Sequence, residues 1–133
     1  ASGFIGVPGG IILGLSGGII CYFSVDLIRS KLKIDDSLDV FAVHGVGGIL
    51  GTLMVSFLAL KIFSGTGLAQ EMSANSQFIA QLFGVILTVV WTLIFTYIAL
   101  KITSFFTSLR VEEQEEVEGL DLRSHGERAY YND

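Results

Sequence analysis

The sequence has little charge, and its charges are unevenly distributed. Charged residues make up 16% of the chain, and three long windows carry none, apart from any charge on His44. These windows are residues 1–25, 40–60 and 72–100. A hydrocarbon core about 30 Å thick is crossed by about 20 apolar helical residues. Each window is long enough to span a membrane, so the sequence predicts an all-α, polytopic integral membrane protein.

The sequence lacks the residue patterns and motifs that indicate several other classes of protein. The one cysteine, Cys21, cannot form an intrachain disulfide. The net charge of −5 arises from residue 110 onward, where eight acids face three bases, and no basic patch indicates nucleic-acid binding. No second histidine, cysteine or carboxylate stands at metal-ligand spacing from His44, and no catalytic triad or phosphate loop is present. We therefore expect neither an enzyme nor a bound metal or cofactor.

The apolar windows predict the organisation of the chain. We expect a transmembrane region, residues 1–106, with helices at about 9–28, 38–60 and 77–106, followed by a tail, residues 107–133. Pro8 stands at the start of the first helix, where its missing N–H costs little. Asp36 is expected to cap the second helix, with Ser37 and Asp39 in its first turn. The chain opens within an apolar stretch and without an initiating methionine, so we expect the C-terminal piece of a longer protein.

Basic residues between the helices predict the orientation in the membrane. The first loop carries Arg29, Lys31 and Lys33, whereas the second carries Lys61 alone. The positive-inside rule places the more basic loop, and with it the C-terminal tail, in the cytoplasm. We therefore expect a multi-pass protein of the plasma or inner cell membrane with a cytoplasmic C-terminus.

Glycine recurs every four residues in the first two predicted helices. The first helix has a row at residues 10, 14 and 18, and the second has Gly47 and Gly51. Such rows let helices approach closely in a membrane, where lipid supplies no hydrophobic drive for association. They favour tight packing in a helix bundle, and a dedicated dimer face is the more specific alternative.

His44 is the one ionisable residue in the segment VFAVHGVGGILGTLM. On an α-helix it shares a face with Gly47, Gly48 and Gly51, where another backbone can come close. An ionisable group inside a bilayer is costly and usually lines a pathway or has a partner. A neutral histidine that hydrogen-bonds across helices is the structural alternative. Asp39 lies about 140° round the helix from His44, which favours an anchor at the cytoplasmic end over a role in conduction.

The tail sequence, LRVEEQEEVEGLDLRSHGERAYYND, allows two interpretations. Its polar, acidic composition is compatible with a disordered solubilising tail. Three features instead favour a segment that docks onto another surface: the glycines at 119 and 126, the leucines at 120 and 122, and the tyrosines at 130 and 131.

Two stretches together resemble the ammonium transporter family, the Amt/Mep/Rh superfamily. IDDSLDVFAVHGVGGILGTLM resembles the tenth transmembrane helix and its preceding loop. LRVEEQEEVEGLDLRSHGERAY is similar to the cytoplasmic tail of bacterial members, and GFIGVPGG fits the entry to the ninth helix. The likeness extends over the whole chain, which resembles helices nine to eleven and the tail of an eleven-helix fold.

The resemblance implies a transport function for the complete protein. Members form homotrimers with one narrow apolar pore per subunit. Ammonium is recruited at the outer mouth and loses its proton, and ammonia, or ammonia with a separately carried proton, passes two hydrogen-bonded histidines in the pore. His44 matches the second histidine, Val40 an apolar pore-lining position, and Asp39 the acidic residue before the histidine motif. The first histidine, the recruitment residues and the phenylalanine gate would lie upstream, so we expect no complete pathway from this chain alone.

The resemblance also implies a regulatory tail. The tail would lie against the cytoplasmic face and couple neighbouring subunits, while a trimeric signalling protein of the P-II class plugs the pore exits when nitrogen is plentiful. Gly119 and Gly126 would permit tight turns. Asp121 and Arg123 are expected to pair with neighbouring loops.

Two other functions remain open at this point. One is a complete three-helix protein that serves as an assembly subunit of a larger membrane complex, with a structural His44. The other is a gas channel of the Rh type, which the acidic tail ending in HGERAY disfavours.

Overall fold

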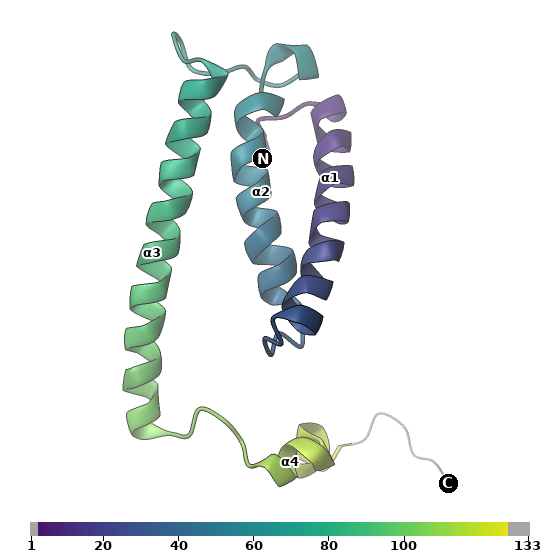
Figure 1. Ribbon diagram of the computed structural model, residues 1–133, viewed down its shortest axis with the longest axis vertical. Helices are drawn as coiled ribbons and strands as arrows, with labels where there is room; N and C mark the ends of the chain where they lie inside the picture. Colours follow the sequence, from purple (N-terminus) through teal and green to yellow (C-terminus); the bar gives the residue numbers. More distant parts are fainter. Residues whose placement is uncertain (1–2, 128–133) are drawn as a thin grey trace, which may run out of the picture. The chain divides into compact units, whose positions relative to one another are not determined.

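The computed structural model of the chain describes residues 3–127 (Figure 1). Within that range every regular element is helical, which confirms the predicted fold class. Three helical stretches are long and apolar enough to cross a membrane, namely Val7–Lys31, Val40–Leu58 and Ala74–Phe106. Their ends lie within three residues of the predicted ends. The number of spans therefore follows from the hydropathy pattern, whereas their ends depend on local backbone geometry.

The first span consists of α1 (Val7–Asp26) and the π-helical turn η1 (Leu27–Lys31). Pro8 lies in the first turn, as predicted. The span ends with two basic side chains in its last turn, where positive charge is favourable beside the negative end of the helix dipole.

The second span consists of the π-helical segment η2 (Val40–Gly45) and α2 (Val46–Leu58). The carboxylate of Asp36 caps this span, as predicted. Its Oδ1 accepts the N–H of Val40 at 2.8 Å, and its Oδ2 accepts those of Phe41 at 3.0 Å and Ala42 at 3.3 Å. Asp39 was expected in the first turn, but it precedes the helix because its backbone has a φ of 54°. Ser37 likewise lies in the preceding turn.

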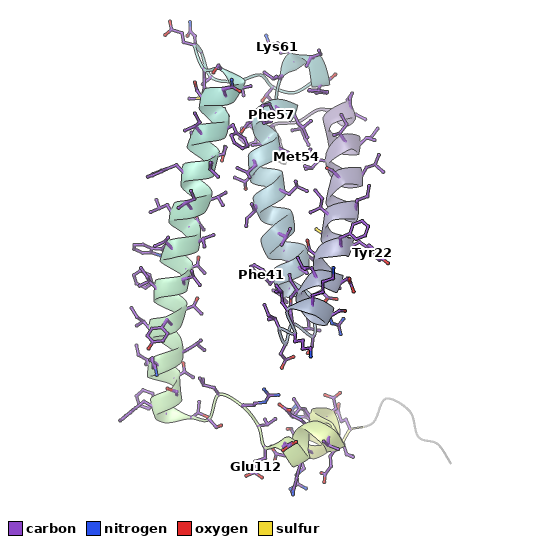
Figure 2. The ribbon with its side chains drawn as sticks, in the orientation of Figure 1. Tyr22, Phe41, Met54, Phe57, Lys61 and Glu112 are labelled. Carbon is purple, nitrogen blue, oxygen red and sulfur yellow. The ribbon has the colours of Figure 1, made fainter. Side chains whose placement is uncertain are left out.

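The described chain divides into two units, Ala1–Val89 and Val90–Asp133, with the division inside α3 (Ala74–Phe106). In the first unit α1 and α2 lie side by side (Figure 1). Met54 of α2 reaches toward α1, and Phe57 forms a ring contact with Phe78 of α3 at a centroid distance of 5.6 Å (Figure 2). The few buried apolar side chains are those of residues 28, 42, 58 and 59. Most other apolar side chains are exposed on the isolated chain and require cover from lipid or protein.

The loop after α2 is joined to the start of the chain. It contains the 3-10 turn η3 (Lys61–Phe63). The N–H of Thr66 donates to the carbonyl of Phe4 at 3.0 Å. A Cβ on Gly6 would collide with the backbone of Ser64, so this approach requires glycine.

The second unit contains the rest of α3, the short helix α4 (Glu113–Glu118) and the π-helical turn η4 (Asp121–His125). Helix α3 ends at Phe106, the residue at which the predicted transmembrane region ends. The described part of the predicted tail, as far as residue 127, therefore contains short helices.

Candidate functional site

His44 lies near the end of η2, immediately before α2 begins. Segments with π winding are frequent at functional sites. The imidazole is exposed and makes no hydrogen bond or ion pair with any described residue. The structural alternative of a histidine bonded across helices thus has no partner within the described part of this chain.

Glycines near His44 do not share one contact surface. A Cβ on Gly47 would lie 3.2 Å from Sγ of Cys21 on α1, whereas Gly48 and Gly51 have open space within 4 Å. All three glycines lie in α2, where successive residues are about 100° apart, so their shared face stays a prediction; the π winding, with i→i+5 bonds, is confined to Val40–Gly45. Gly47 thus lies against Cys21 of α1, whereas Gly48 and Gly51 leave space for the approach of a further helix.

The glycine row of α1 is also open in this chain. Cβ atoms on the glycines at 10, 14 and 18 would meet nothing within 4 Å. The glycine at which α1 approaches α2 closely is Gly9, where a Cβ would lie 3.3 Å from the carbonyl oxygen of Leu58. The glycine row of α1 does not pack against α2, and in the second row Gly47 faces α1 while Gly51 remains open to other helices.

Val40 begins η2 and is 52% exposed. It lies four residues before His44, and its backbone is held by the Asp36 carboxylate. An apolar side chain and an imidazole are thus both exposed on one short segment that is anchored at its start.

Asp39 forms an ion pair with Arg29, with 3.5 Å between its Oδ1 and the guanidinium nitrogen. The aspartate side chain is 27% exposed, and its Oδ1 is buried without a hydrogen bond from a described residue. The ion pair links the end of the first span to the start of the second. This arrangement agrees with an anchor at the end of the spans, away from the imidazole.

Cys21 is a residue near His44 that the sequence analysis did not single out. Its thiol donates to the carbonyl oxygen of Val43 at 3.8 Å, so α1 contacts the backbone beside His44. No hydropathy or motif signal indicates this contact, because it depends on the rotation of α1 against α2. Among residues 3–127, no group of three or more histidine, cysteine or acidic side chains could hold a metal ion.

The tail residues singled out from the sequence lie on or beside α4 and η4. Gly119 has a φ of 93° and Gly126 a φ of 66°, values that favour glycine. Arg123 was expected to pair with neighbouring loops, but its described partners are Glu115 at 3.7 Å and Glu118 at 3.5 Å, both in α4. These acids lie within a turn of the chain reversal at Gly119, which brings η4 back toward α4.

The other tail residues either make local contacts or lie outside the described range. Asp121 begins η4, and its carbonyl accepts the N–H of Glu127 at 3.1 Å. Arg110 forms a two-point ion pair with Glu116, with N–O distances of 2.7 and 2.9 Å. Tyr130 and Tyr131, predicted as docking residues, lie outside the described residues.

Comparisons with known proteins agree on one family. The family model for the Ammonium Transporter Family matches residues 1–130. The chain is 42% identical to Ammonium transporter Amt1 of Archaeoglobus fulgidus, over 98% of this chain and 33% of the relative. It is 41% identical to Ammonium transporter 1 of Dictyostelium discoideum, over 99% of this chain and 29% of the relative.

A bacterial relative shows the same pattern of coverage. The chain is 36% identical to an ammonium transporter of Bacillus subtilis, over 98% of this chain and 32% of the relative. The chain thus spans about a third of the length of these relatives. The relatives are transporters, in agreement with the lack of catalytic motifs in the sequence. Because the family model covers nearly the whole sequence, the chain belongs to the ammonium transporter family.

Proposed function

We propose that this chain forms part of a membrane transporter that conducts ammonium or ammonia through a narrow apolar pore lined by His44. The observation that carries the proposal is the family match over residues 1–130, which includes the histidine-bearing span. The exposed imidazole on η2 supports it, since a pore-lining side chain must be uncovered on its own helix.

The chemistry of the imidazole suits this task. A dry pore imposes a large penalty on a full ammonium charge, whereas neutral ammonia loses only hydrogen bonds to water. A neutral imidazole donates from one ring nitrogen and accepts on the other, and it can relay a proton. His44 would replace part of the lost hydration of ammonia without adding a permanent charge to the pore.

Neighbouring residues would support the histidine in different ways. Val40, exposed four residues earlier, would line the pore and keep water out. Asp39, paired with Arg29, would anchor the start of the span. Gly47 admits the approach of α1, and Gly51 leaves room for a further helix.

The remaining walls of the pore would come from segments outside these 133 residues. Three observations support this: relatives about three times as long, the open glycine row of α1, and an α3 with no buried residue. We propose that the intact protein assembles as a homotrimer with one pore in each subunit. Its C-terminus would lie in the cytoplasm, consistent with the three bases of the first loop against one in the second.

The tail would regulate transport from the cytoplasmic side. Its short helices and internal ion pairs support an ordered segment that docks on the membrane domain. The partner proposed for this face is a trimeric P-II signalling protein that closes the pore exits. Gly119 and Gly126 would provide the chain reversals that docking needs.

Transport by the intact protein in sealed liposomes tests the proposal. We expect saturable uptake of labelled methylammonium that unlabelled ammonium inhibits. Liposomes that contain a similar amount of an unrelated multi-pass protein serve as the control. Uptake no faster than in the control would favour the alternative of an assembly subunit with a structural histidine.

A further inference from the structure

We propose that Cys21 is a positioning residue that, together with Gly47, holds the His44 segment in place against α1. The inference rests on the proposed transport role of His44. It assigns a function to a contact between two spans, in which the thiol bonds to the carbonyl of Val43, the residue before the histidine.

Two features of the contact connect it to His44. The Sγ atom lies 3.8 Å from the Val43 oxygen inside η2 and would lie 3.2 Å from a Cβ on Gly47, one turn further along. The thiol therefore fits between the π-helical segment and the start of α2. Any larger residue at Gly47 would push the sulfur away from the Val43 carbonyl.

The use of a thiol follows from the behaviour of the serines in the same helix. Ser16 donates to the carbonyl of Ile12 at 2.8 Å, and Ser24 donates to that of Ile20 at 2.7 Å, both four residues back in α1. Both hydroxyls thus bond to carbonyls of their own helix, and that of Ser16 also lies 3.4 Å from Sδ of Met54 on α2. A thiol is a weaker donor with a longer reach, and Cys21 crosses to the neighbouring span.

The consequence of the contact is positional. A π-helical segment is less regular than an α-helix, so its side-chain directions depend on outside contacts. At its start η2 is held by Asp36, and beside His44 it is held by Cys21. Loss of the second contact would let the imidazole move while the cap and the span remain in place.

A double-mutant cycle on the intact protein tests this inference. The variants are Cys21→Ala, Gly47→Ala and the double variant, and the readout is the ratio of ammonium to methylammonium transport. A packing defect lowers both rates together, whereas a displaced imidazole changes their ratio. We expect each single variant to change the ratio about two- to fivefold, as loss of one weak hydrogen bond would. The double variant should show the change of one single variant, because both remove the same contact.

Ser16→Ala is the matched control. It removes another side-chain contact between α1 and α2, in which Ser16 Oγ lies 3.4 Å from Met54 Sδ. Met54 is ten residues further along the chain than His44. It should keep the wild-type ratio. A wild-type ratio in Cys21→Ala, or additive changes in the double variant, would overturn the inference. If Gly47→Ala does not insert, Cys21→Ala alone decides. His44→Ala in the same assay separates the transport role of His44 from the positioning role of Cys21. If His44→Ala alters the ratio and Cys21→Ala does not, only the positioning role is overturned.

Discussion

At the scale of single residues, the proposed transport role depends on His44 and on the groups that fix the segment around it. The carboxylate of Asp36 accepts three backbone N–H groups at the start of η2, and Asp39 pairs with Arg29 beside it. These charged groups lie at the end of the spans, while the imidazole lies five residues beyond Asp39 along the helix. Charged groups therefore anchor the start of the second span, and the imidazole lies further along the same span.

Removal of the Asp36 cap should destabilise the second span. Three N–H groups would lose their acceptor in Asp36→Ala, which we expect to cost about 1–2 kcal/mol. Asp36→Asn, which keeps one acceptor oxygen, should recover part of this loss. Thermal unfolding of the detergent-solubilised intact protein measures the effect.

Ser37→Ala provides the control for this prediction. Ser37 is exposed and donates only to the side chain of Asp35, so its removal should leave the unfolding temperature within error of wild type. Equal stability of Asp36→Ala and Ser37→Ala would show that the carboxylate does not cap the span.

At the scale of elements, the sequence predicts some features and misses others for physical reasons. Hydropathy predicts three spans because the bilayer thickness imposes a minimum apolar length. The cap at Asp36 is predictable because helix N-termini need acceptors. The π winding at His44 is not, because hydropathy contains no term for the backbone hydrogen-bond register. The shared face of His44 with Gly47, Gly48 and Gly51 therefore stays a prediction, and of the three glycines Gly47 is the one beside α1.

The orientation of the spans can be tested by labelling of introduced cysteines. Ser37→Cys in the first loop should resist an impermeant thiol reagent added outside, whereas Gln70→Cys in the second loop should react. Both side chains are exposed on the chain. Ser73 is less suitable because its hydroxyl accepts the N–H of Ser76 at 3.1 Å.

Two further measurements complete the labelling experiment. The protein with its native Cys21, half-buried at the α1–α2 contact, supplies the background signal. Both sites should react after the membrane is permeabilised. The opposite pattern in sealed cells, with Ser37→Cys labelled and Gln70→Cys protected, would place the first loop and the C-terminus outside.

At the scale of the whole molecule, the chain spans about a third of the length of its relatives. Its spans expose apolar surface, the glycine row of α1 has no partner within the described residues, and the relatives are about three times as long. On the proposed function, a conducting pathway would require further helices, and these spans would supply one histidine. The tail forms short helices of its own, so its removal should spare assembly, which depends on the spans.

Gly119→Asp should impair the tail without loss of trimers. A residue with a Cβ at a φ of 93° costs about 1–3 kcal/mol, enough to disturb the reversal that brings Arg123 to α4. We expect a lower transport rate with normal membrane levels, as for a truncation before Leu120. Gln114→Asp is the control, since it adds the same charge at an exposed helical position. Normal transport after truncation, with normal shut-off by the proposed P-II partner, would show that the tail is only a solubilising segment.

Transport by the His44→Ala variant of the folded intact protein is the decisive test of a pore lined by His44. Trimer formation and membrane levels are measured first, so that any change in transport is not one of folding. We predict that uptake of ammonium and methylammonium is abolished or strongly altered. We also predict that His44→Asp keeps some conduction with changed selectivity, because a carboxylate can also exchange protons. Wild-type uptake and selectivity in a folded His44→Ala trimer would contradict the account and make His44 a structural residue.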